Sequence, residues 1–109
     1  MTSQEIRELA SRAIHEECAL HDIEVKRIIL FGSQAREQAG PDSDWDFLVC
    51  VNCDMPFAQR TAVSTSIQRR LAARAISADL IFKSEARLKQ ERGNVGVVSY
   101  YALRDGVPV

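Results

Sequence analysis

The sequence lacks any long uninterrupted run of apolar residues, and it lacks an excess of positive charge. No apolar stretch approaches the length that spans a bilayer, and the first residues carry acidic side chains where a signal peptide would be apolar. The 14 Lys and Arg residues are balanced by 15 Asp and Glu residues, which leaves a formal net charge of −1. We therefore expect a cytoplasmic protein with no membrane partner and no general nucleic-acid-coating role.

Cysteine is scarce and its count is odd, which predicts reduced thiols in a chain without an export signal. Cys50 and Cys53 form a C-x-x-C pair, but a zinc site needs four ligands and a second pair is missing. A redox pair normally opens a helix, whereas Cys50 falls inside a predicted strand. We expect one core thiol and one loop thiol. His15 and Cys18 lie three apart without a third metal ligand in view, which favours helix packing.

The chain has the size and composition of one soluble globular domain. Its 109 residues are 46% hydrophobic and 27% charged, which is enough to bury a core without disulfides or a structural metal. No internal repeat, low-complexity segment or linker divides it. We therefore expect a single domain over residues 1–109, with no room for a second one.

Hydrophobic periodicity predicts helices that alternate with strands. We expect helices over residues 3–22, 57–76, 84–92 and 95–104, strands over 25–31, 44–51 and 78–82, one or two helical turns in 33–38, and a tail over 106–109. The apolar residues of the 95–104 helix, among them Val98, Tyr101 and Leu103, are expected in the core. This order predicts an α/β fold with a short mixed sheet flanked by helices.

Two aspartates stand two apart at the start of the second predicted strand. Side chains alternate along a strand, so Asp44 and Asp46 point the same way, while Trp45, Phe47 and Val49 face the core. Two adjacent carboxylates repel each other unless a cation lies between them. Mg²⁺ is the natural occupant, because it is a hard cation that binds carboxylates together with substrate phosphates.

Two further features make this pair more specific than a lone D-x-D, which is usually a solvated turn. Gly32 and Ser33 end the first strand and open a helical turn, so backbone N–H groups and the serine hydroxyl can bind a triphosphate. Asp79 lies in an apolar strand, where an unpaired carboxylate is costly to bury. If that strand is adjacent, three carboxylates can hold two Mg²⁺ ions, with Asp79 as the proton acceptor.

The pattern resembles the nucleotidyltransferase superfamily that includes DNA polymerase β and the aminoglycoside nucleotidyltransferases, and most closely its minimal members. The signature is Gly-Ser, about ten residues, Asp-x-Asp and a third carboxylate on a later strand. It corresponds here to Gly32, Ser33, Asp44, Asp46 and Asp79, and Ala35, Arg36 and Ser43 also match. Arg36 is thereby implied as a nucleotide-binding residue. Glu37 departs from the pattern, because many members have glycine there and an acid near the triphosphate weakens nucleotide binding.

The resemblance implies a polymerase β palm-like fold and a Mg²⁺-dependent enzyme that transfers a nucleotide, AMP from ATP, to a hydroxyl of a partner. Minimal members are often paired with a small helical HEPN-type RNase toxin, and act as its antitoxin by binding it and modifying a tyrosine. Two alternatives stay open. One is a binding module that neutralises a partner through contact alone, and the other is an enzyme that modifies a small molecule such as an antibiotic.

Overall fold

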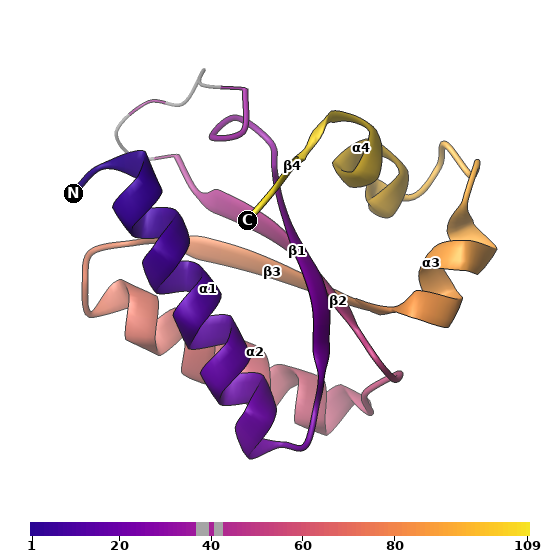
Figure 1. The fold of residues 1–109 in the computed structure, drawn as a ribbon, viewed down its shortest axis with the longest axis horizontal. Coiled ribbons are helices and arrows are strands. Elements are labelled where there is room, and N and C mark those ends of the chain that lie inside the picture. Colours follow the sequence, from indigo (N-terminus) through magenta and orange to yellow (C-terminus); the bar gives the residue numbers. More distant parts are fainter. Residues whose placement is uncertain (37–39, 41–42) are drawn as a thin grey trace.

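A mixed four-stranded sheet organises the chain, as a computed structural model describes it for residues 1–36, 40 and 43–109 (Figure 1). The sheet has the order β3-β2-β1-β4. Its strands are β1 (Val25–Phe31), β2 (Trp45–Val51), β3 (Ala78–Ser84) and β4 (Val107–Pro108). β1 is antiparallel to both β2 and β4, whereas β2 and β3 are parallel. The predicted short mixed sheet is confirmed.

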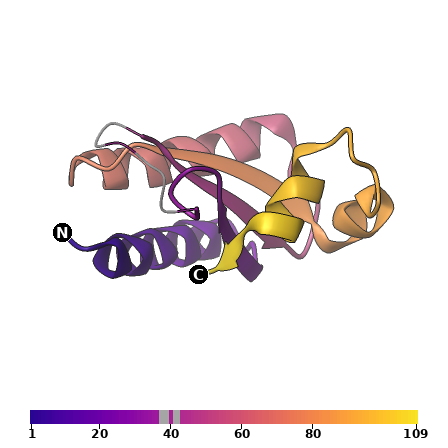
Figure 2. The ribbon, with the colours of Figure 1, turned by 90° about the horizontal axis from the view of Figure 1, so that it is seen from above.

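Two long helices cover one face of the sheet, and two short helices lie against the other (Figures 1 and 2). The long pair is α1 (Ser3–Leu20) and α2 (Phe57–Ala72), and the short pair is α3 (Glu85–Glu91) and α4 (Val98–Asp105). α1 begins at a capping box, in which the Thr2 hydroxyl accepts from the Glu5 amide and the Glu5 carboxylate accepts from the Thr2 amide. No helix in the described ranges is long and apolar enough to cross a membrane.

The main core lies between the sheet and the long helices. Alternate residues of β2 point into it, so Trp45, Phe47 and Val49 are buried there, as predicted. Ile14 of α1 and Ile67 of α2 pack against this apolar surface from the side of the long helices. Asp46 alternates with these residues along β2, so its carboxylate lies on the face of the sheet opposite the long helices.

The C-terminal region differs from the prediction in two ways. The expected core role of its apolar residues is wrong, because Val98, Tyr101 and Leu103 are 43%, 47% and 37% exposed. α4 is buried against the sheet through the small Ala102, whereas these larger side chains stay partly exposed. The expected tail is also wrong, because Val107 pairs with Leu30 and extends the sheet as β4. Apolar spacing cannot distinguish a short edge strand from a tail.

Two predicted helix boundaries differ from the structure by at least three residues. α2 ends at Ala72 instead of residue 76, because the chain turns there with Ala75 at φ 61° and the Ile76 amide donating to the Leu71 carbonyl. This is the hydrogen-bonding pattern of a helix C-terminal turn, normally made with glycine. α4 begins at Val98, after residues 93–97 that the periodicity placed partly in the helix.

The cysteines allow a direct test of the packing. Cys18 and Cys50 are buried and Cys53 is exposed, which confirms one core thiol and one loop thiol in the C-x-x-C pair. Burial, with a smaller contribution from Glu17, raises the pKa of the Cys18 thiol to about 11. Because the thiolate is the reactive species, we expect only Cys53 to react with a thiol reagent at pH 8.

The reactivity of the three thiols is measured by counting those that react before and after unfolding. We expect one in the folded protein and three in denaturant. The control is Cys53→Ser, which removes the reactive group of the folded state and leaves the core unchanged. Rapid labelling of Cys18 in the folded Cys53→Ser variant would contradict the described packing.

Candidate active site

Three aspartates from two strands and the segment before β2 lie at one end of the sheet. Asp46 in β2 has Asp79 in β3 as its Cα partner on one side and Phe31 in β1 as its partner on the other. Partners on adjacent strands project to the same face, so the two carboxylates emerge side by side. Asp44 directly precedes β2. The condition that Asp79 lie on an adjacent strand, which the sequence left open, is met.

The charges of these aspartates act on one another. Partial burial of Asp46, followed by the negative charges of Asp79 and then Asp44, raises the pKa of the Asp46 carboxyl above its ordinary value. Asp44 and Asp79 are exposed to solvent, so the cluster is open on its outer side. A group of like charges with one raised pKa is the arrangement that a bound cation stabilises.

A hydrogen bond that the sequence did not indicate orients Asp44. The Ser77 hydroxyl donates to Asp44 Oδ1 over 2.6 Å, and the Trp45 amide donates to the Ser77 carbonyl over 2.9 Å. Ser77, the residue before β3, therefore binds Asp44 through its side chain and Trp45, the first residue of β2, through its backbone. Only the parallel pairing of β2 and β3 brings Ser77 and Asp44 together across 33 positions, so no local motif could have revealed it.

The Gly32 turn approaches the aspartates closely. Gly32 has φ +76°, and a Cβ on it would collide with Asp46 Oδ2. The Arg36 amide donates to the Gly32 carbonyl over 3.3 Å, which closes one helical turn after β1, and residues 37 and 38 of the predicted helical segment lie outside the described residues. Gln34 donates to the carbonyl of Ser43, the residue before Asp44, over 3.2 Å. The Gly-Ser turn and the aspartates thus form one connected site.

The two remaining residues predicted to bind nucleotide lie along this turn. Ser33 follows Gly32 directly and is half-buried. Arg36 is exposed. It lies close enough to α4 to affect Asp105, because a hydrogen bond from Arg104 and then the charges of Arg104 and Arg36 lower the pKa of the Asp105 carboxyl. Arg36 thus lies at the outer end of the turn on the α4 side. Glu37, the predicted departure from the motif, lies outside the described residues.

The three aspartates suit a metal ion in the chemistry of their donor atoms but not in their present arrangement. The donors are carboxylate oxygens, which hard divalent cations prefer, and the pKa of Asp46 is raised by burial first and then by the charges of Asp79 and Asp44. However, the acidic, histidine and cysteine side chains of the described ranges form no group of three or more that is already arranged to hold a metal ion. The donor chemistry fits Mg²⁺, and side-chain rotation would have to complete a coordination shell.

The chain was compared with known proteins. Residues 13–99 match a family model described as polymerase beta, nucleotidyltransferase. A solved structure described as a candidate minimal nucleotidyltransferase superposes with a TM-score of 0.59 and 22% sequence identity, covering 95% of each chain. At this identity the likeness concerns the fold. A comparison with curated proteins gave no significant match.

Proposed function

This chain belongs to the polymerase β nucleotidyltransferase family, and from that membership we propose that it transfers AMP from ATP to a hydroxyl group of a partner protein. The observation that carries the proposal is the pairing of Asp46 with Asp79 across β2 and β3, beside a glycine that leaves no room for a side chain. The segment that matches the family contains all of these residues. Their position at the open end of the sheet gives a substrate access to them.

Asp44, Asp46 and Asp79 would hold two Mg²⁺ ions together with the triphosphate. When bound, Mg²⁺ neutralises phosphate charge and makes an acceptor hydroxyl easier to deprotonate. The hydrogen bond from Ser77 orients Asp44 and uses one of the several lone pairs of its carboxylate, so capacity for a cation remains. Desolvation of Asp46 strengthens its interaction with any cation that binds there.

In the transfer itself, the acceptor oxygen forms a bond to the α-phosphorus and the bond to the bridging oxygen of pyrophosphate breaks. Asp79 is exposed beside Asp46, and it would accept the proton of the hydroxyl. Gly32 permits close approach of the backbone, the Ser33 hydroxyl can donate to a phosphate oxygen, and Arg36 supplies positive charge at the outer end of the turn. Pyrophosphate leaves with the negative charge.

We propose that the acceptor is a tyrosine of a small helical HEPN-type toxin and that the chain is its antitoxin. In-line transfer needs the acceptor oxygen held about 3–3.5 Å from the phosphorus. A partner protein can supply this positioning, because Asp44 and Asp79 are exposed at the strand ends. This extension rests on the resemblance of the Gly-Ser and Asp-x-Asp motif to minimal nucleotidyltransferases, whereas the solved structure supports the fold.

The test is to incubate the chain with ATP, Mg²⁺ and the product of the adjacent gene, and then to weigh that product by mass spectrometry. We expect it to gain one or more AMP units. The gain should disappear with EDTA and with Asp44→Asn. The matched control is Asp54→Asn, which makes the same chemical change at an exposed loop position outside the cluster.

Two other results would contradict the proposal. If the partner binds tightly and loses its activity without gaining mass, the chain is a binding module. If the partner gains no mass but a small-molecule hydroxyl substrate does, the chain modifies small molecules instead. Replacing ATP with each of the other three nucleoside triphosphates in the same assay establishes the base preference.

A further inference from the structure

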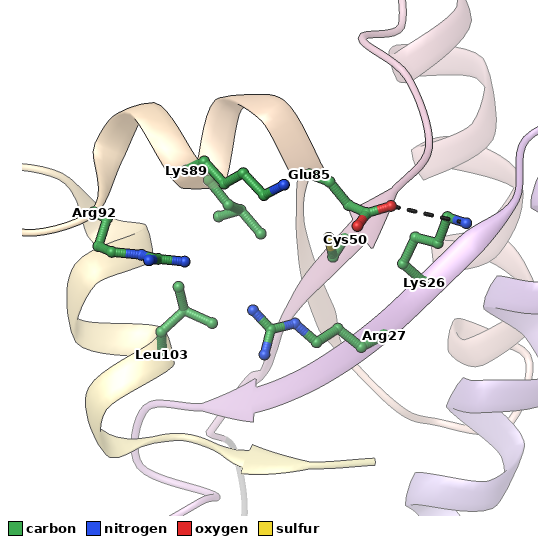
Figure 3. A pocket seen from close by; sticks show the side chains of 8 residues that line it. Lys26, Arg27, Cys50, Glu85, Lys89, Arg92 and Leu103 are labelled. Carbon is green, nitrogen blue, oxygen red and sulfur yellow. Dashed lines mark ion pairs between the residues drawn. The ribbon is translucent and has the colours of Figure 1, made fainter.

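A second pocket lies on the same face of the sheet as the aspartates, towards its other end. Its volume is about 360 Å³, and it lies between β1, α3 and α4 (Figure 3). The floor includes Cys50, four residues along β2 from Asp46, so roughly 13 Å separates the two positions. Leu88 and Leu103 add apolar walls. Neither the Gly32 turn nor any of the three aspartates lines this pocket.

Four of the eight residues that line the pocket are cationic, namely Lys26, Arg27, Lys89 and Arg92. Arg27 and Arg92 point into it from opposite sides, and Lys89 extends over it from α3 (Figure 3). Over the described ranges, none of these three residues forms an ion pair with an acidic side chain. Glu85, the acidic residue of the lining, lies 3.8 Å from Lys26 Nζ. Positive charge therefore predominates here, in a chain whose net charge is −1.

Glu91, the last residue of α3, is also engaged. Glu91 accepts from Lys83 over 3.0 Å and from the Ser99 hydroxyl over 2.8 Å. Surface cations usually extend into solvent, where their charge is screened. Two guanidinium groups that face each other over a partly apolar floor repel one another, and an anion between them converts this repulsion into attraction.

We propose that this pocket binds a small phosphate-bearing molecule of about mononucleotide size. Arginine presents a fork of N–H donors that binds phosphate oxygens in pairs, and two such forks face one space. The volume falls at the lower end of the range for small-molecule sites, roughly 300–1,000 Å³. An adjoining pocket of about 380 Å³ shares Arg27 and Arg92 and adds Arg104 and Tyr100, with the Arg104 guanidinium 5.7 Å from the centre of the Tyr100 ring. The site is separate from the aspartates and does not rest on the proposed function.

The experiment is calorimetry in EDTA, which removes divalent cations and so suppresses binding at the aspartates. The probes are inorganic pyrophosphate, 5′-AMP, citrate and a single-stranded oligonucleotide. We expect one pyrophosphate or AMP per chain, with affinity at least roughly 30-fold lower in Arg27→Gln/Arg92→Gln, because two charge-assisted contacts are lost. Arg69→Gln/Arg74→Gln removes the same charge from exposed positions around the end of α2 and should bind as the wild type does.

Two further variants keep the result unambiguous. Lys89→Gln, at an exposed position of α3, should weaken binding several-fold even if the double variant does not fold. Asp44→Asn should bind pyrophosphate normally, which separates this site from the aspartates. Equal weakening in both double variants would overturn the proposal, since it would indicate a general charge effect. No saturable binding of either phosphate probe, tighter binding of citrate, or saturation with the oligonucleotide alone would overturn it too.

Discussion

Replacing Asp46 with asparagine is expected to abolish nucleotide transfer while making the metal-free protein more stable. Asparagine keeps the size of the side chain and removes the negative charge that a cation needs. We expect a loss of about a thousandfold in rate, or about 4 kcal/mol of transition-state stabilisation. Asp46 is the central member of the cluster, because it faces Asp79 and Gly32, and because burial together with the charges of both other aspartates raises the pKa of its carboxyl.

The stability gain has a definite pH dependence. A carboxyl whose pKa is raised in the folded state favours its neutral form there, so the folded protein loses stability as pH rises and Asp46 ionises. Asparagine mimics the neutral form at every pH. We therefore expect the melting temperature of Asp46→Asn to exceed that of the wild type at neutral pH, and the difference to vanish below the ordinary carboxyl pKa of 3.8.

Thermal unfolding in EDTA, measured at pH 3 and pH 7, checks the stability, and the mass assay checks transfer. Asp54→Asn is the control for both, since Asp54 is exposed in the loop after β2. Adding Mg²⁺ with ATP should raise the melting temperature of the wild type more than that of Asp46→Asn. A large loss of stability in Asp46→Asn at neutral pH would instead identify Asp46 as a structural acid.

Much of this site follows from the period of the strands. Alternation along β2 is enough to predict that Trp45 and Phe47 are buried and that Asp46 lies on the opposite face. The contribution of Asp79 depends on strand order, which alternation does not determine. The residue pattern predicts that β2 and β3 are strands. That they are adjacent and parallel depends on the tertiary packing, in which both long helices cover one face of the sheet.

The features that could not be predicted depend on contacts between distant segments. Ser77 reaches Asp44 only because β2 and β3 pair in one register. Val107 and Pro108 form a strand only because the edge of β1 is free to accept them, and a proline is compatible with such an edge position. α4 is amphipathic by sequence, yet it buries Ser99 and Ala102 and exposes its larger apolar residues. Local patterns predict elements, and tertiary contacts select which face each element buries.

Gly32→Ala is expected to impair the active site more than it impairs the fold. The substitution places a Cβ at φ +76°, which costs roughly 1–2 kcal/mol in an L residue. The new Cβ also collides with Asp46 Oδ2, so the carboxylate must move. A shift of about 1 Å in a reacting group costs roughly a hundredfold in rate, and we expect transfer to fall by at least that factor.

Gly93→Ala provides a matched control, because Gly93 has φ +81° and, among the described residues other than its chain neighbours, no atom lies within 4 Å of the position a Cβ would take there. Both variants should lose similar stability from backbone strain, but only Gly32→Ala should lose transfer and Mg²⁺-dependent ATP binding. The contact itself is isolated by adding Asp46→Ala, which removes the carboxylate. In that background, Gly32→Ala should lower the melting temperature no more than Gly93→Ala does, since only strain remains. If Gly32→Ala retains full transfer activity, the close approach of Gly32 to Asp46 has no part in the reaction.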